Sequence, residues 1–118
     1  MSNLVQVEAS ETDGVVVVRL SGELDVAGAE ATGGRIGQAV PNSAHGLVVD
    51  FTDLRFIDSS GVAMLFTLAR RLESRRQRLR CVAPPGSPVA RVLEIVEFGR
   101  AAPVDQHLEQ ALAGIAGA

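Results

Sequence analysis

The sequence contains neither tryptophan nor tyrosine, and its four phenylalanines bring the aromatic content to only 3%. A core built from this composition must be aliphatic. Proteins that bind single-stranded nucleic acid stack its bases on aromatic side chains, so the shortage also removes their usual contact surface. The single cysteine, Cys81, excludes an internal disulfide framework and is typical of a reducing compartment.

Positive charge is also in short supply. The chain has a formal net charge of −3, and all eleven basic residues are arginine. This balance predicts no general attraction to nucleic acid or to an anionic membrane surface. No apolar run approaches the roughly 18 residues of a membrane span, and the opening residues lack the pattern of a signal peptide. We therefore expect a cytoplasmic protein.

The composition and length favour one folded unit. Hydrophobic residues make up 47% of the 118 residues and charged residues 21%, which is typical of globular chains rather than disordered ones. A chain of this length can build one core but not two. No linker, low-complexity tract or repeat divides it, so we expect residues 1–118 to form a single domain.

Strand patterns alternate with helical ones along the chain. The runs LVQVEAS (4–10) and GVVVVRLSG (14–22) flank Asp13-Gly14, a dipeptide that favours a tight turn, and predict an opening antiparallel hairpin. The apolar run GLVVDF (46–51) predicts a strand buried on both faces, as in a parallel sheet, and LRCVA (79–83) predicts another. Together they predict an α/β fold with a mixed, largely parallel sheet.

About four helices complete this prediction. Within the segment 26–40, the glycines at positions 33, 34 and 37 each cost roughly 1 kcal/mol relative to alanine, so the segment predicts a weak helix held by packing. Apolar residues at three- and four-residue steps predict a helix over 59–73. Shorter helices are expected over 89–99, ended by Gly99, and near the end of the chain, where Asp105 is a candidate cap.

The start of the 59–73 helix is unusually rich in polar groups. Asp58, Ser59 and Ser60 stand directly before Gly61, and each of the three is a good residue type for a helix cap. A helix needs only one such cap for its unpaired N–H groups, and the cap is worth about 1 kcal/mol. Helix capping therefore explains any one of these three residues but does not explain the other two.

Apolar side chains surround the next two turns of this helix. From residue 62 to 69 only Thr67 is polar, and Met64 and Leu68 lie off the main apolar stripe. This pattern predicts either burial between the sheet and a neighbouring helix or a docked partner. A phosphate on an adjacent serine would add about 1.5 to 2 negative charges. The free N–H groups of the helix start would accommodate it, whereas a partner covering the hydroxyl would not.

These segments together resemble the STAS domain family, and in particular the bacterial anti-sigma factor antagonists. The resemblance spans almost the whole chain and rests on LSGELD (20–25), LVVDFTDLRFIDSSG (47–61) and the apolar helix that follows. It implies a binding module rather than an enzyme, with no cofactor of its own. The chain departs from the family in its glycine-rich first helix and in Val62-Ala63, where many relatives carry Leu-Gly.

The resemblance implies partner switching. In this family the unphosphorylated antagonist binds an anti-sigma factor, which then releases a sigma factor to RNA polymerase. The same anti-sigma factor is the serine kinase of the antagonist and holds ATP and Mg²⁺, and a serine phosphatase reverses the modification. The implied phosphorylation site is Ser59, the first hydroxyl after the motif aspartate. With Met64 from the apolar face, the predicted partner-binding residues are Asp25, Asp58, Ser59, Ser60, Gly61 and Met64.

Two acids are expected near the phosphorylation site. The resemblance places Asp25 close to the loop that carries Ser59, and Asp58 directly precedes it. Their carboxylates would repel a phosphate on Ser59 unless a cation or metal from the partner compensated. Asp25 has an open alternative, because it is also a typical turn residue before a helix.

A serine hydrolase is one alternative function, because a serine at a strand-to-helix turn resembles a nucleophile elbow. That motif is G-x-S-x-G, whereas Ile57 stands two residues before Ser59, so half the pattern is missing. His45 or His107 could serve as the general base only if the fold brought it to Ser59.

Two further alternatives concern binding. Six arginines lie between Arg70 and Arg80 and could contact nucleic acid or an acidic protein. We expect four of them in the last turns of the helix, where cations suit the negative end of the dipole. The other alternative is a STAS scaffold or nucleotide-responsive interaction module that does not act on a sigma factor. No glycine-rich phosphate loop is present, and Cys81 fits a buried strand better than a redox site.

Overall fold

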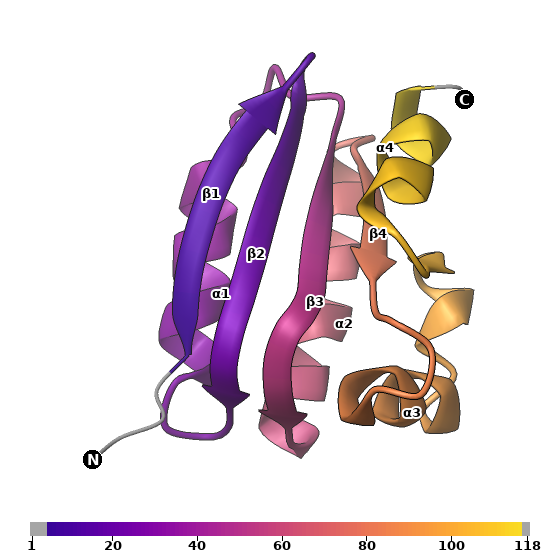
Figure 1. Ribbon diagram of the computed structural model, residues 1–118. Coiled ribbons are helices and arrows are strands. Elements are labelled where there is room, and N and C mark those ends of the chain that lie inside the picture. The colour runs from indigo at the N-terminus through magenta and orange to yellow at the C-terminus, as the bar shows by residue number, and fades with distance from the viewer. Residues whose placement is uncertain (1–4, 117–118) are drawn as a thin grey trace.

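A five-stranded sheet with helices on both faces organises the chain (Figure 1). The computed structural model describes residues 5–116. Its strands are β1 (Gln6–Thr12), β2 (Val15–Leu24), β3 (Gly46–Ile57), β4 (Arg78–Val82) and β5 (Val104–Asp105). Its helices are α1 (Ala29–Ala39), α2 (Ser59–Ser74), α3 (Pro88–Ile95) and α4 (Leu108–Ala116), with a short 3₁₀ turn, η1 (Phe98–Arg100), after α3.

The strands lie in the order β1-β2-β3-β4-β5, with β1 antiparallel to β2 and all other neighbours parallel. Asp13 and Gly14 form the hairpin turn with φ values of 51° and 82°, the positive range that suits a tight two-residue turn. The predicted α/β fold, with its mixed sheet, opening hairpin and four helices, is confirmed. Leu4 of the predicted first strand and residues 117–118 of the predicted last helix lie outside the described residues.

Apolar layers cover the two faces of the sheet. Helices α1 and α2 lie behind it in Figure 1 and α4 lies in front, while α3 sits near the carboxyl end of β3. Successive residues of a strand point to opposite faces, so Leu47 joins the core beneath α1 and α2, and Val48 joins the core beneath α4. Every residue from Gly46 to Phe51 is buried, as predicted for a strand covered on both faces.

Three element boundaries differ from the prediction by three residues or more. Strand β3 continues beyond Phe51 to Ile57, because β2 pairs with it as far as Leu24. Helix α1 begins at Ala29, three residues late, because a turn at Asp25 precedes it. Helix α3 ends at Ile95 and not near Gly99, because Glu97 adopts a left-handed backbone conformation with a φ of 56°.

Asp105 does not cap α4, so that prediction was wrong. Its carboxylate accepts two hydrogen bonds from the Arg80 guanidinium, at 2.8 and 3.0 Å, and these raise the pKa of Arg80. At the start of α4, the backbone N–H groups of Gln106 and His107 donate to Oε1 of Gln110 instead. The carboxylate of Asp105 therefore pairs with Arg80 on the neighbouring strand β4 and does not bond to the N–H groups at the start of α4.

Cys81 lies on β4, between β3 and β5, and has no exposed surface. Burial raises the pKa of its thiol far above the ordinary value, which suppresses the reactive thiolate. This placement confirms the interpretation of Cys81 as a core residue. None of the helices in residues 5–116 combines the length and the apolar character that crossing a membrane requires.

Candidate functional site

The carboxyl ends of β2 and β3 bring the predicted site residues together. The two strands remain paired up to Leu24 and Ile57, so the loops that follow them start side by side. The backbone N–H of Asp58 donates to the Leu24 carbonyl at 3.1 Å. Asp25 and Asp58, which are far apart in the sequence, therefore lie at the same edge of the sheet.

Asp58 caps α2 and ties the two loops to each other. Its Oδ1 accepts hydrogen bonds from the backbone N–H groups of Ser60, at 2.9 Å, and Gly61, at 3.1 Å. Its Oδ2 accepts from the N–H of Val26 in the β2–α1 loop, at 3.2 Å. Of the three candidate caps in the sequence, Asp58 is the one used, and neither serine hydroxyl is spent on capping.

Removal of the Asp58 carboxylate is expected to weaken both connections. Loss of an acidic N-cap costs about 0.5 to 2 kcal/mol, so Asp58→Ala should lower the free energy of unfolding by about 1 to 2 kcal/mol. Urea unfolding followed by circular dichroism measures the change. The control is Asp53→Ala, because Asp53 is exposed and its carboxylate accepts no hydrogen bond within residues 5–116. Equal losses in the two variants would contradict the assigned role of Asp58.

Asp25 forms the turn that leads into α1. Its Oδ1 accepts the N–H of Ala27 at 3.1 Å, and its carbonyl accepts the N–H groups of Gly28 and Ala29 at 3.0 and 2.9 Å. The interpretation of Asp25 as a turn residue is therefore confirmed. The same turn holds Val26 against Asp58, so Asp25 also lies beside the loop that carries Ser59.

Val26 belongs to this site although the sequence analysis did not select it. Its backbone bonds to Asp58, while 75% of the residue's surface is exposed. A large apolar residue directly after a turn aspartate was the signal available in the sequence.

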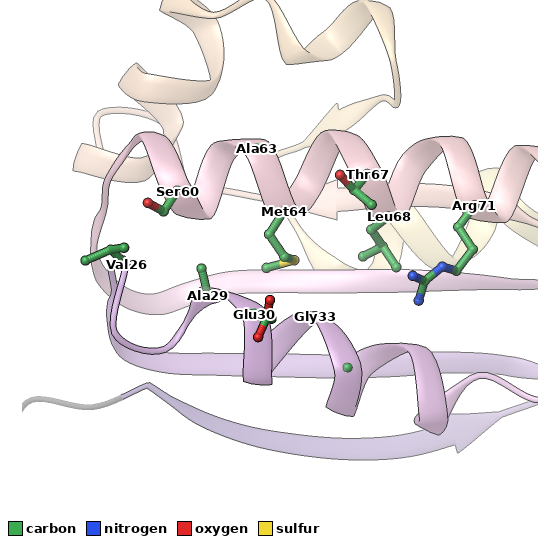
Figure 2. Close-up of a pocket in the computed structure, with 11 residues that line it drawn as sticks. Val26, Ala29, Glu30, Gly33, Ser60, Ala63, Met64, Thr67, Leu68 and Arg71 are labelled. Atoms are coloured by element: carbon green, nitrogen blue, oxygen red, sulfur yellow. The ribbon is translucent and has the colours of Figure 1, made fainter.

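The two serines differ in their surroundings. Ser59 is the first residue of α2 and is exposed, whereas Ser60 is half-buried. Figure 2 shows Ser60 near Val26, at one end of the space between α1 and α2. Neither hydroxyl makes a hydrogen bond to another of residues 5–116. Ser59 is therefore the hydroxyl that an enzyme or partner can reach most directly.

Gly61 allows the start of α2 to lie close against the sheet. A Cβ atom at this position would stand 2.7 Å from Cγ1 of Ile57 and 3.0 Å from Cγ of Leu24. Gly61 is itself buried and offers no surface to a partner. Its role among the predicted partner-binding residues is to let α2 lie close to the sheet.

A groove of about 770 Å³ runs from Ser60 along the space between α1 and α2 (Figure 2). Met64 lies half-buried on its wall, where a Cβ at Gly33 would stand 2.9 Å from the Met64 Cγ. Leu68 is only 4% exposed, whereas Thr67 remains exposed. Burial against α1 thus explains part of the apolar surface of α2. The rest of that surface lines the open groove.

The histidines do not complete a hydrolase site at Ser59. His45 precedes β3, and the 12 residues of that strand separate it from the loop that carries Ser59. His107 precedes α4, which packs on the opposite face of the sheet from α2. Across residues 5–116, no group of three or more His, Cys, Asp or Glu side chains is placed to hold a metal ion.

The arginine cluster is spread over more than the end of α2. The helix ends at Ser74, Arg75 forms its C-cap, and Arg76 lies beyond it with a φ of 58°. The prediction that four arginines lie in the last turns was therefore wrong for Arg75 and Arg76. The chain turns here because the N–H of Gln77 returns to the Leu72 carbonyl at 2.9 Å.

A family comparison accounts for this arrangement of strands and loops. The model of the STAS domain matches residues 6–111. The chain belongs to the STAS domain family. All of the predicted site residues of this STAS domain fall within the matched region, and the family resemblance inferred from the sequence is confirmed. No curated protein matches the chain.

Solved structures similar to this STAS domain include anti-sigma factor antagonists. One from Mycobacterium paratuberculosis is 26% identical, with 98% of this chain and 97% of that chain covered and a TM-score of 0.86. The unphosphorylated form of the antagonist SpoIIAA is 31% identical, with 97% and 99% covered and a TM-score of 0.71. The phosphorylated form of the Bacillus cell fate determinant SpoIIAA is 28% identical, with 93% and 99% covered and a TM-score of 0.69.

Proposed function

We propose that this STAS domain is an anti-sigma factor antagonist controlled by phosphorylation of Ser59. In its unphosphorylated form it binds an anti-sigma factor that is also its serine kinase, and thereby frees a sigma factor. The similar structures support this class, since they include anti-sigma factor antagonists and both phosphorylation states of SpoIIAA. The observation that carries the proposal is the exposed Ser59 hydroxyl at the start of α2, directly beside the Asp58 cap.

The surroundings of Ser59 make a phosphate there a strong signal. The N–H groups of Ser60 and Gly61 are already bonded to the Asp58 carboxylate, and the Val62 N–H is bonded to the Asp58 carbonyl. The expectation that free N–H groups would accommodate the phosphate is therefore wrong for these three donors. The added charge would stay at the surface, beside the carboxylates of Asp58 and Asp25.

The proposed consequence is a switch in binding that leaves the fold unchanged. Ser59 is exposed and is not one of the residues of the hydrophobic core, so its modification should not disturb the packing beneath α2. A partner that covers the hydroxyl or brings carboxylates towards it is repelled by the phosphate. ATP and Mg²⁺ are assigned in this proposal to the kinase, and a serine phosphatase restores the binding form.

Mapping of the phosphorylated residue tests the proposal directly. Incubation with the cognate kinase and Mg-ATP should add one phosphate, which mass spectrometry of the digested protein should locate on Ser59. Ser59→Ala should remain unmodified. The neighbouring Ser60→Ala variant is the matched control and should still be phosphorylated, because its own hydroxyl is half-buried in the groove. A phosphate on Ser60 or elsewhere would overturn the site assignment.

A further inference from the structure

A second cavity lies at the opposite end of the molecule from Ser59. It has a volume of about 540 Å³ and is bordered by the β1–β2 turn, the α1–β3 loop, the α2–β4 turn and the carboxyl end of α4. These segments meet at the amino ends of β3 and β4, so the length of β3 separates this cavity from the phosphorylation loop (Figure 1). Nothing in the proposed switch uses this end of the sheet.

The lining of this cavity is strongly cationic. Arg75, Arg76 and Arg78 contribute to it together with His45, and the one carboxylate among its lining residues is that of Asp13. None of the three arginines forms an ion pair within residues 5–116. The groove beside α2, by comparison, is lined by one glutamate and one arginine.

The backbone holds these arginines on a fixed frame. The buried Gln77 side chain donates through Nε2 to the carbonyls of Pro41 and Ala44, at 2.9 and 3.1 Å. This pair of hydrogen bonds ties the α2–β4 turn, which carries Arg76, to the α1–β3 loop, which carries His45. The N–H of Arg78 also donates to the His45 carbonyl, at 3.3 Å. Side chains from two separate segments are thereby kept around one cavity.

A favourable contact with the helix dipole does not explain all of these charges. That effect falls off within the last turn of a helix, and α2 ends at Ser74. Arg76 lies beyond the cap in a left-handed conformation, and Arg78 is the first residue of β4. Unpaired guanidinium groups that surround a cavity are instead suited to an anionic ligand.

We propose that this cavity binds the polyphosphate group of a small anion. Guanidinium groups match the oxygens of phosphate in a two-pronged geometry, and three of them offset the charge of a chain of phosphates better than that of a single one. The volume lies within the range of about 300 to 1,000 Å³ that is typical of small-molecule sites. A long nucleic acid is disfavoured, because the protein carries a net charge of −3 and would repel it outside the cavity.

Calorimetric titration with inorganic tripolyphosphate tests this site. The wild-type chain should bind one molecule, and the double variant Arg75→Gln/Arg76→Gln should bind at least about a hundredfold more weakly, roughly tenfold for each guanidinium lost. The matched control is Arg55→Gln/Arg91→Gln, which removes the same charge from exposed residues outside the cavity. This control should bind tripolyphosphate as the wild type does, and so should Ser59→Glu.

Each alternative result overturns the proposal. Absence of tripolyphosphate binding would show that the cavity is not an anion site. An equal loss of affinity in both double variants would show that only the overall charge of the protein matters. Backbone amide shifts in a two-dimensional NMR titration should cluster in residues 42–45 and 75–78, and shifts confined to the Ser59 loop would place the anion elsewhere. A single-stranded oligonucleotide that displaced tripolyphosphate with higher affinity would favour nucleic acid. A parallel titration with ATP distinguishes a nucleotide from a free polyphosphate as the source of the phosphate chain.

Discussion

Glutamate in place of Ser59 is expected to weaken binding to the anti-sigma partner by at least about a hundredfold, whereas Ser59→Ala should bind as the wild type does. The reason is the local accumulation of negative charge. Asp58 already holds the nearest backbone donors, so a carboxylate on residue 59 gains no compensating hydrogen bond from Ser60 or Gly61. Like charges brought together in an interface cost several kcal/mol.

Surface plasmon resonance with the purified partner measures this effect. Ser43→Glu is the matched control, because Ser43 is exposed in the α1–β3 loop at the other end of the sheet and the variant has the same net charge. The proposed switch predicts a large difference between the two variants. Similar affinities would contradict it, and capture of the same ATP-binding partner by Ser59→Ala and Ser59→Glu baits would favour the scaffold alternative.

Replacement of Gly61 by valine is expected to lower the free energy of unfolding by about 2 to 3 kcal/mol, in the upper part of the range for overpacked cores. The first added carbon would already lie 2.7 Å from Cγ1 of Ile57 and 3.0 Å from Cγ of Leu24. Both neighbours are buried at the ends of their strands, so relief requires α2 to move away from the sheet. That movement would also displace Ser59 and weaken partner binding.

The control for this prediction is a second glycine on the other side of the groove. Gly34 lies in α1, and a Cβ built there meets no atom within 4 Å. Gly34→Ala should therefore raise the free energy of unfolding by up to about 1 kcal/mol, the ordinary difference between the two residues in a helix. Urea unfolding measures both variants. An increase in the free energy of unfolding of both variants would show that helix propensity, and not the local packing, decides the outcome at Gly61.

Local chemistry made most of the fold predictable. Asp13-Gly14 formed the expected turn, and the continuous apolar run of 46–51 became the central buried strand. The ends of the helices were less accessible to sequence reasoning. The end of α3 depends on the left-handed conformation of Glu97, a residue type that does not signal this conformation. The start of α1 depends on hydrogen bonds to Asp25 that compete with the helix.

At the start of α2 the sequence predicted a cluster of polar residues but not which of them forms the cap. The motif placed three polar groups at the start of α2, and any of them could have been the cap. The choice of Asp58 depends on the end of β2, which brings the Val26 N–H to the second carboxylate oxygen. Asp105 illustrates the same limit, because its partner Arg80 is 25 residues away and becomes a neighbour only through the register of β4 and β5.

The burial of Cys81 provides a built-in reporter of unfolding. This residue is the only cysteine of the chain, and its thiol is both inaccessible and held in the protonated form. Alkylating reagents in solution react with the thiolate, so in the native protein they have no target until the sheet opens. The rate of Cys81 labelling therefore reports how often the strands around β4 open. A cysteine introduced at the surface can also carry a fluorophore without competition from Cys81.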